Sequence, residues 1–263
     1  SINVVGTQHS IDFCKDFHKK LYHISTISVS GASTPEDDSS TERFIFDETK
    51  FYIGQNLNNA YIYTKFEAEK IVLENINSGL DACILRIGNI SNRFSDSRFQ
   101  INTTDNAYIN RLKAFFKLGV LPKKLADHSI EFTPVDACAE AIIKIVMNNP
   151  KFTVFHLFDT NLISIPNLVE IFNSLGYNLD FVSKKEFSDV LNKFLLDDTL
   201  KDSISGIVPD LDEKKHLNLV SNVLPNADFT TRYLNSLGFY WPIIDANYIT
   251  NYILYFKNIG YLE

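Results

Sequence analysis

The sequence predicts an α/β protein in which a parallel sheet is followed by a smaller, mainly helical C-terminal part. The first observation is that a strand pattern, a helix pattern and a second strand pattern follow one another between residues 21 and 90. Such a series is typical of a parallel sheet with a right-handed crossover helix. The second observation is that helical patterns dominate from about Lys184 onward, with prolines as breaks. Third, 263 residues with 45% hydrophobic content suffice for a large core.

The first half of the chain supplies the sheet pattern. The chain opens within a helix pattern, and Leu21–Ser30 then predicts a buried strand because it is rich in β-branched residues and ends at Gly31. Ala60–Glu74 combines helical spacing with strong helix formers, and Ala82–Ile90 predicts a second buried strand. Between the first strand and this helix, the polar segment Ser33–Glu42 lacks apolar periodicity and predicts a mobile surface loop.

Three further helices and one strand are expected later in the chain. In chain order they are the helices Asn106–Leu118 and Thr133–Met147, the strand Phe152–Phe158 and the helix Ile165–Leu175. Thr133 is expected to cap its helix, with Pro134 in the first turn, because these residue types are favoured at those positions.

Charge and cysteine content argue against several classes of protein. A net charge of −7 and a pI near 5.4 give no general attraction to nucleic acid or anionic membranes. Cys14, Cys83 and Cys138 lack paired spacing, and the six histidines lack ligand spacing, so neither a disulfide framework nor a metal site is expected. No signal peptide is recognisable and no apolar run approaches about 18 residues. We therefore expect a cytoplasmic protein without a membrane partner.

The pair Tyr61 and Lys65 is the first candidate for chemistry. Positions i and i+4 share a helix face, so the ammonium can approach the phenol and lower its pKa from about 10. A tyrosine of this kind suits a general acid that protonates an alkoxide. About one Tyr-x-x-x-Lys pair is expected by chance in a chain of this composition, so the spacing alone favours a solvated surface pair.

The strand before this helix adds a hydroxyl group. Thr26 lies near the carboxyl end of the predicted strand Leu21–Ser30, and side chains at that end of a parallel strand face the ligand crevice. Taken alone, serine and threonine are ordinary strand residues. A hydroxyl-bearing strand, a tyrosine helix and an arginine–glycine strand in this order favour the functional interpretation.

Six short motifs occur in one order along the chain. They are Asn3-Val-Val-Gly-Thr7, Ser25-Thr-Ile-Ser-Val29, Tyr61-Ile-Tyr-Thr-Lys65, Arg86-Ile-Gly-Asn-Ile90, Glu131-Phe-Thr-Pro-Val-Asp136 and Leu237-Gly-Phe-Tyr-Trp-Pro242. Each motif is weak alone, but the six in this order are specific. In this combination the chain resembles the extended short-chain dehydrogenase/reductase family. Within that family it resembles the thioester reductase domains that end nonribosomal peptide synthetases, including those of the aureusimine (pyrazinone) type.

The resemblance implies a fold and a division of the chain. Residues 1–92 and 135–160 would form a Rossmann-type NADP-binding core, and residues 93–134 and 161–263 a part that binds the substrate and its carrier. Two departures from the family pattern stand out. Ile87 replaces the proline usual after the arginine, and the Gly-rich phosphate loop with its following basic residues is absent. We therefore expect the first strands of the nucleotide domain to be missing from this chain.

The resemblance also implies an activity. NADPH would reduce a peptidyl or acyl thioester, held on the phosphopantetheine arm of a carrier protein, to an aldehyde or, in a further step, to an alcohol. Thr26 would hydrogen-bond the carbonyl oxygen, Tyr61 would donate the proton, and Lys65 would lower the pKa of Tyr61. Tyr61 and Lys65 would also contact the cofactor, Lys65 through the nicotinamide ribose. The backbone is expected to approach the nicotinamide at Gly88, Asn89 and Ile90.

Alternatives remain open from the residues themselves. One is another extended-family enzyme with the same tyrosine and lysine, such as a sugar-nucleotide epimerase or a free-aldehyde reductase; the ending Leu237–Pro242 favours the thioester branch instead. The other is a non-catalytic interaction domain that has kept the fold, which the missing phosphate loop favours. Gly88 and Asn89 are equally consistent with a plain strand-to-loop turn. His156 lies inside an apolar strand and is interpreted as a core histidine whose hydrogen bonds are satisfied.

Overall fold

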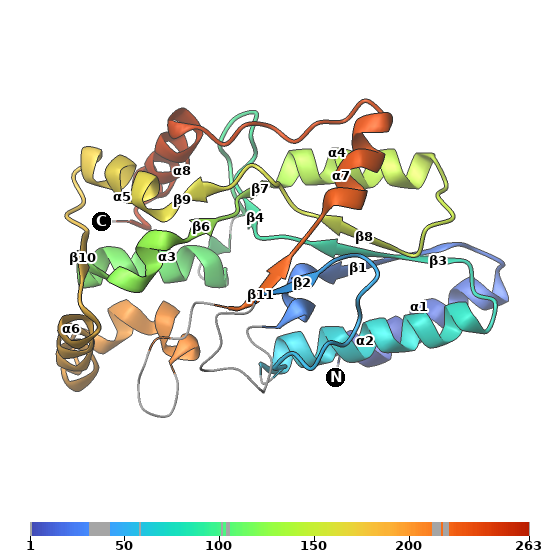
Figure 1. Ribbon diagram of the computed structural model, residues 1–263, viewed down its shortest axis with the longest axis horizontal. Helices are drawn as coiled ribbons and strands as arrows, with labels where there is room; N and C mark the ends of the chain where they lie inside the picture. Colours follow the sequence, from blue (N-terminus) through green and yellow to red (C-terminus); the bar gives the residue numbers. More distant parts are fainter. Residues whose placement is uncertain are drawn as a thin grey trace. The chain divides into compact units, whose positions relative to one another are not determined.

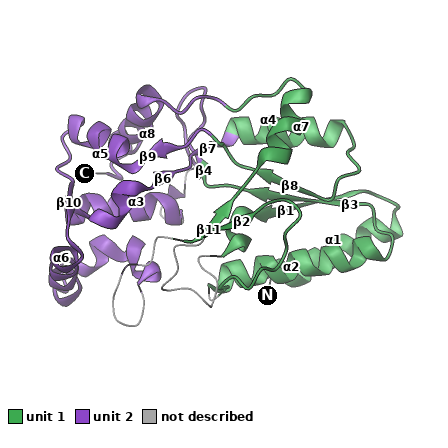
Figure 2. Ribbon diagram, in the orientation of Figure 1, with its two compact units in different colours: residues 1–90, 136–160, 221–241 green, residues 91–135, 161–220, 242–263 purple. Residues whose placement is uncertain are grey.

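The chain folds into two compact units built from interleaved segments (Figure 2). The computed structural model describes residues 2–31, 43–57, 59–100, 102–103, 106–211, 217 and 221–262. Unit 1 comprises Ser1–Ile90, Asp136–Thr160 and Ser221–Trp241, and unit 2 comprises Ser91–Val135, Asn161–Val220 and Pro242–Glu263. The predicted loop Ser33–Glu42 lies outside the described residues. The predicted α/β class with a parallel sheet is confirmed.

Unit 1 is built on a three-stranded parallel sheet. Its strands, in the order β1-β3-β8, are β1 (Leu21–Thr26), β3 (Ala82–Ile87) and β8 (Val154–Leu157). The helices α1 (Ile2–Asp16) and α2 (Ala60–Asn77) pack side by side on one face, and α4 (Val135–Met147) and α7 (Asp228–Ser236) lie on the other (Figure 1). Buried apolar residues of these helices contact both faces of the sheet, as expected for a parallel sheet.

Several predicted element boundaries in unit 1 differ from the structure; the strand predicted at Ala82–Ile90, for example, ends at Ile87. Two of the differences have clear local reasons. Strand β1 ends at Thr26, not Ser30, because the Thr26 side chain accepts a hydrogen bond from Ser28 N and starts a 3-10 helix, η1 (Ile27–Ser30). Gly31 follows with a φ of +71°, and Gln55 lies within 3 Å of where a Cβ would stand. A side chain at position 31 would therefore be strained and crowded.

Helix α4 begins two residues later than predicted. Thr133 and Pro134 form the short strand β7 (Thr133–Pro134), and the helix starts at Val135. The Thr133 hydroxyl donates a hydrogen bond to the Glu131 carboxylate. The predicted helix start at Thr133 is therefore wrong, and the capping role of Thr133 stays a prediction.

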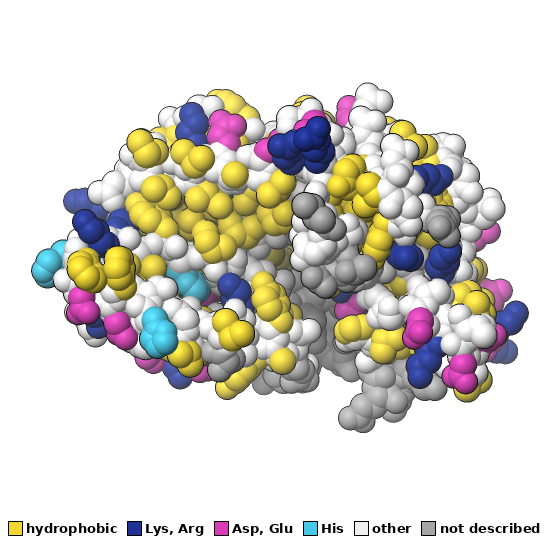
Figure 3. Space-filling view, turned by 180° about the vertical axis from the view of Figure 1, so that it is seen from behind, with side chains coloured by type: hydrophobic (Ala, Val, Ile, Leu, Met, Phe, Trp, Pro, Cys, Tyr) yellow, Lys and Arg dark blue, Asp and Glu magenta, His cyan; other side chains and the backbone are white. Residues whose placement is uncertain are grey.

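Apolar side chains gather on the outer surface seen in Figure 3. In unit 1 the exposed apolar residues include Val5 and Phe13 on α1, Phe17 directly after it, and Ile24 on the outer strand β1. The rings of Phe13 and Phe17 lie tilted against each other with 4.7 Å between centroids, yet each is more than half exposed. A gathering of this kind is more typical of a contact surface than of an ordinary solvated surface.

Unit 2 is mainly helical. Its helices are α3 (Ala107–Leu118), η3 (Lys123–Asp127), α5 (Ile165–Ser174), α6 (Lys184–Leu196), η4 (Lys201–Asp210) and α8 (Ala246–Asn258). Its short strands form a parallel pair, β5 (Val120–Pro122) with β10 (Asp180–Val182), and an antiparallel pair, β6 (Ser129–Ile130) with β9 (Ile163–Ser164). One large apolar cluster with Ile109, Phe172 and Phe256 at its centre holds these elements together. The predicted helices at Asn106–Leu118 and Ile165–Leu175 are confirmed to within one residue.

The compact units differ from the predicted division of the chain in one segment. Residues Ser221–Trp241 belong to unit 1, although the sequence placed them with the C-terminal part. The physical reason is pairing: β11 (Val223–Pro225) adds to β2 (Phe44–Phe46) in parallel, and Leu234 of α7 packs into the apolar layer over β8. The assignment of either part to substrate binding stays a prediction.

Candidate functional site

All six predicted site residues lie in unit 1. Thr26 ends β1, Tyr61 stands in the first turn of α2, and Lys65 follows one turn later. The other three lie directly after β3, at Gly88, Asn89 and Ile90, and Ile90 opens β4 (Ile90–Ser91). Because Thr26 pairs with Ile87 in register, the two strands end at the same edge of the sheet. The predicted residues therefore converge on the carboxyl edge of β1 and β3, where parallel sheets bind ligands.

The start of α2 is fixed by a side-chain cap. Asn59 Oδ1 accepts hydrogen bonds from Tyr61 N, at 2.9 Å, and from Ile62 N, at 3.2 Å. A cap of this type satisfies backbone donors that the helix cannot pair itself. It also determines that Tyr61 occupies the first turn, where its side chain is 53% exposed.

Thr26 and Tyr61 form the centre of the site. Thr26 is 8% exposed, and its hydroxyl donates to Ser28 Oγ at 3.1 Å. Burial raises the pKa of Tyr61 above its ordinary value of 10, and the nearby Thr26 side chain opposes this rise. The threonine at the end of β1 therefore lies beside the phenol at the start of α2. The expected effect of Lys65 on the pKa of Tyr61 stays a prediction, because burial and Thr26 are the causes of the shift in this structure.

Lys65 points to the strand instead of the phenol. Its Nζ donates a hydrogen bond to the backbone oxygen of Ile24 at 3.0 Å. Burial lowers the pKa of Lys65, and the carboxylate of Glu69, one turn further along α2, opposes that shift. The ammonium is therefore held at the edge of β1 by the Ile24 carbonyl, close to where a cofactor ribose is expected.

The backbone after β3 is also held in place. Gly88 N donates to the backbone oxygen of Leu157, the last residue of β8, at 3.0 Å. This bond continues the sheet ladder by one residue beyond Ile87. The segment predicted to approach the nicotinamide therefore leaves the sheet edge from a fixed point.

A buried ionic network, which the sequence analysis missed, lies directly behind these residues. Glu69 and Arg86 are both fully buried, and the Arg86 guanidinium donates to the Glu69 carboxylate through Nε, at 3.1 Å to each oxygen, and through Nη2, at 2.8 Å. Ser25 Oγ donates to Glu69 Oε1 at 2.5 Å. A useful signal was the arginine within the otherwise apolar strand ACILRI, because a buried guanidinium requires a partner.

His156 completes this network on the far side of Arg86. Arg86 Nη1 donates to the Lys50 backbone oxygen at 2.9 Å and lies 3.0 Å from His156 Nε2. Because a guanidinium only donates, Nε2 accepts and Nδ1 carries the proton, which it donates to the Asn226 backbone oxygen at 2.7 Å. The interpretation of His156 as a satisfied core histidine is confirmed.

The lowered pKa values of two histidines in unit 1 lead to a prediction of how the stability of the protein depends on pH. Burial, followed by the charge of Arg86, lowers the pKa of His156 to about 3, and burial, followed by Lys65, lowers that of His23 to about 4. Unfolded histidines titrate near 6.5, so the unfolded chain binds more protons below that pH. The free energy of unfolding should therefore fall from pH 6.5 to 5, approaching about 1.4 kcal/mol per pH unit for each histidine.

Urea unfolding curves at fixed pH values check this prediction. The range above pH 5 is chosen because ordinary carboxyl groups titrate below it. The variant His9→Gln removes an exposed histidine and should leave the slope unchanged. A free energy of unfolding that stays constant between pH 6.5 and 5 would show that neither buried histidine is held neutral.

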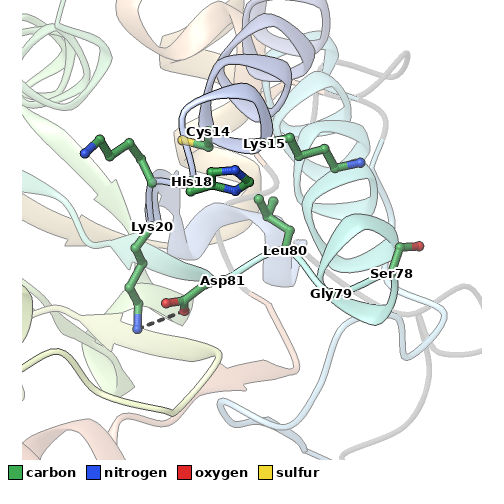
Figure 4. Close-up of a pocket in the computed structure, with 9 residues that line it drawn as sticks. Cys14, Lys15, His18, Lys20, Ser78, Gly79, Leu80 and Asp81 are labelled. Carbon is green, nitrogen blue, oxygen red and sulfur yellow. Dashed lines mark ion pairs between the residues drawn. The ribbon is translucent and has the colours of Figure 1, made fainter.

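A separate pocket lies at the other end of the strands (Figure 4). It has a volume of about 450 Å³ and is lined by residues that include Lys15, His18, Lys20 and Asp81. The Lys20 ammonium lies 3.1 Å from the Asp81 carboxylate. Since Lys20 precedes β1 and Asp81 precedes β3, this pocket is at the amino ends of the strands and is not part of the candidate site.

The part of the chain that the structure describes contains neither a metal-binding cluster nor a membrane-spanning helix. Within it, no three histidine, cysteine, aspartate or glutamate side chains are grouped so that they could hold a metal ion. None of its helices combines the length and the apolar character that a membrane span requires.

Comparisons with known proteins give the following matches. The family model described as "Male sterility protein", an NAD-binding domain, matches residues 1–142. A thiolation-reductase di-domain from an archaeal nonribosomal peptide synthetase is 29% identical with a TM-score of 0.82, covering 99% of this chain and 54% of that chain. The comparison with curated proteins gives no match.

Two further solved structures are similar over nearly the whole chain. A reductase domain of the aureusimine biosynthetic cluster is 25% identical with a TM-score of 0.81, and covers 98% of this chain and 65% of that chain. The terminal R domain of the myxalamid PKS-NRPS pathway, at 23% identity and a TM-score of 0.81, covers 100% and 64% and shows the shared fold. The chain thus spans between about half and two thirds of the length of these structures.

Proposed function

Because the chain belongs to the male sterility protein family of NAD-binding domains, we propose that it is part of an NADPH-dependent reductase that acts on carrier-bound thioesters. The product would be an aldehyde, which a second reduction converts to an alcohol. The similarity to reductase domains of nonribosomal peptide synthetases supports this substrate class. We assign the carrier protein, with its phosphopantetheine arm, as the partner.

The observation that carries the proposal is the placement of Thr26, the last residue of β1, and Tyr61, in the first turn of α2, at the carboxyl edge of the sheet. Both hydroxyl groups can hydrogen-bond one carbonyl oxygen from the side on which negative charge develops. Donors placed in advance at such a position stabilise an oxyanion more than water does. This pair therefore suits addition of hydride to a carbonyl carbon.

Tyr61 is the proposed proton donor. Its phenol is half-exposed at the edge of the sheet, so it can reach a bound carbonyl group and donate its proton as the oxyanion forms. When the proton passes to the oxyanion, the product is a hemithioacetal. Collapse of the hemithioacetal breaks its C–S bond, returns the thiol to the phosphopantetheine arm and leaves the aldehyde.

The residues at the site fit the nicotinamide end of a dinucleotide cofactor. A nicotinamide would supply the hydride when bound. The Lys65 ammonium at the edge of β1, the half-exposed Tyr61 phenol and the backbone at Gly88, Asn89 and Ile90 would hold the ribose and the ring. The choice of NADP over NAD is part of the proposal and comes from the family resemblance.

Two further assignments follow from the same proposal. Unit 2 would contact the substrate and its carrier, because its mainly helical fold corresponds to the C-terminal part of the family pattern. All three cysteines are buried, and no disulfide joins them. Cysteines without disulfides are typical of a reducing compartment, so we propose the cytoplasm as the location.

The proposal is tested by the form of substrate that the full-length protein reduces. With NADPH, a peptidyl or acyl thioester on its carrier protein should be turned over with a much higher kcat/KM than the same acyl group as a free acid. The thiol leaves readily from a hemithioacetal, whereas a free carboxylate offers no comparable leaving group. Equal rates with the two substrates would contradict the thioester assignment.

A further inference from the structure

One fully buried carboxylate is bonded to both segments that carry the proposed catalytic groups. Glu69 lies on α2, one turn beyond Lys65 and two turns beyond Tyr61. It accepts a hydrogen bond from Ser25, the residue immediately before Thr26 on β1. Glu69 therefore attaches the helix that carries the tyrosine to the strand that carries the threonine, in addition to the bond from Lys65 to the Ile24 carbonyl.

Strand register explains why this attachment is tight. Ser25 of β1 pairs with Arg86 of β3, so their side chains lie next to each other on the same face of the sheet. The Glu69 carboxylate lies against this pair and accepts hydrogen bonds from both side chains. Contacts to two neighbouring strands restrict both rotation of α2 about its axis and sliding along it.

Stability alone does not explain such a network. Taking a carboxylate and a guanidinium out of water is costly, and apolar residues of similar volume often give equal or higher stability. At this position, however, an apolar replacement would lose the directional bonds to Ser25 and Arg86. Directional bonds fix the position of a helix more narrowly than apolar packing does, which matters where a catalytic group must be placed within about half an ångström.

We propose that Ser25, Glu69 and Arg86 are positioning residues that hold Tyr61 and Lys65 of α2 in register with Thr26 of β1. The catalytic meaning of this inference rests on the proposed function, but the structural restraint itself does not. Small errors of placement are expensive in catalysis: a displacement of about 1 Å can cost roughly 100-fold in rate. The network thus acts through the geometry of the site, without contact with the substrate.

Glu69 has a second effect on the same site, through the charge of Lys65. Lys65 faces the Glu69 carboxylate on its own helix, and His23 and the Ile24 carbonyl on β1. His23 is neutral at pH 7 because its pKa is about 4, so Glu69 supplies the favourable charge. Removing that charge should lower the pKa of Lys65 further and shorten the pH range in which the ammonium persists.

The variant Ser25→Ala tests the positioning role with the least disturbance, because it keeps the Glu69–Arg86 ion pair. In the full-length protein with NADPH and a carrier-bound thioester, kcat should fall about 10-fold, while KM and the affinity for NADPH stay within about twofold. The matched control is Tyr22→Phe, which removes a hydroxyl from the opposite face of the same strand, where it bonds Val146 O. That control should retain the kcat of the unmodified protein.

A pH profile adds a readout that a merely structural role would not change. In Glu69→Gln, the alkaline limb of kcat/KM should move to lower pH, because Lys65 loses its proton earlier. If the alkaline limb of Glu69→Gln lies at the same pH as that of the unmodified protein, the assigned effect of Glu69 on the pKa of Lys65 is wrong. If Glu69→Gln does not fold, Ser25→Ala alone decides the positioning role.

Amide hydrogen exchange separates failure of this inference from failure of the proposed function. Exchange in the first two turns of α2, at residues 61–66, should be faster in Ser25→Ala than in the unmodified protein, whatever the substrate is. If the unmodified protein does not reduce thioesters but exchange rises, the proposed function fails and the restraint stands. Unchanged exchange together with unchanged kcat in Ser25→Ala would overturn the inference.

Discussion

Replacing Tyr61 by phenylalanine is expected to lower kcat for thioester reduction by about 10²–10⁴-fold, the usual contribution of general acid catalysis. The substitution removes one hydroxyl and keeps the ring, and Asn59 still caps the helix. The Thr26 hydroxyl can still turn from Ser28 Oγ to donate to the carbonyl oxygen. Lys65 and the backbone after β3 keep their proposed contacts with the cofactor, so the affinity for NADPH should fall only a few-fold. Stopped-flow measurement of NADPH oxidation gives the loss in kcat directly.

Tyr63 on the same helix provides the matched control. It is 51% exposed, almost as much as Tyr61, but lies two residues further and therefore about 200° around the helix. Tyr63→Phe should leave kcat within about twofold of the unmodified protein. If Tyr63→Phe proved as damaging as Tyr61→Phe, the assignment of this helix face to the site would be wrong.

Replacing Arg86 by methionine is expected to lower the free energy of unfolding by about 3–5 kcal/mol, the usual cost of removing one partner from a buried ion pair. Glu69 would remain buried with only the Ser25 hydroxyl as a partner. The His156 ring and the Lys50 carbonyl would each lose a donor as well. Urea unfolding at pH 7, followed by circular dichroism, measures this loss.

The matched control for that variant is Arg93→Met. Arg93 also forms an ion pair, with Asp96, but both side chains are more than a third exposed. Surface pairs of this kind contribute about 0–1 kcal/mol, so the control should unfold almost like the unmodified protein. Equal losses in the two variants would mean that burial does not set the strength of the Arg86 pair.

The sequence was sufficient where periodicity and residue type act locally. The helix predicted at Ala60–Glu74 begins as expected and runs three residues further, and the strands begin at Leu21 and Ala82 as their apolar patterns indicate. Thr26, Tyr61 and Lys65 were predicted as site residues. Boundaries failed where local contacts that the pattern does not encode act on the chain. Thr26 turns the chain into η1, and Thr133 and Pro134 form a short strand before α4.

The buried network could not be assembled from local patterns. Glu69 and Arg86 are 17 residues apart, and Ser25 is 44 residues from Glu69, so only the register of β1 against β3 brings them together. The spacing Lys65-x-x-x-Glu69 places Glu69 on the helix face that carries the catalytic pair. The sequence alone does not show that Glu69 is buried against the sheet there, so its role in the network could not be predicted. The raised pKa of Tyr61 was missed for the same reason, since burial is the larger cause of the shift.

The most direct test of the central claim follows the hydride itself. The full-length protein is supplied with NADPH that carries deuterium at the transferred position of C4, together with a carrier-bound acyl thioester, and the released product is analysed by mass spectrometry. The account predicts an aldehyde with one deuterium on the former thioester carbon, formed together with free thiol on the carrier and an equal amount of NADP. Release of an unlabelled free acid, with NADPH left unconsumed, would contradict it.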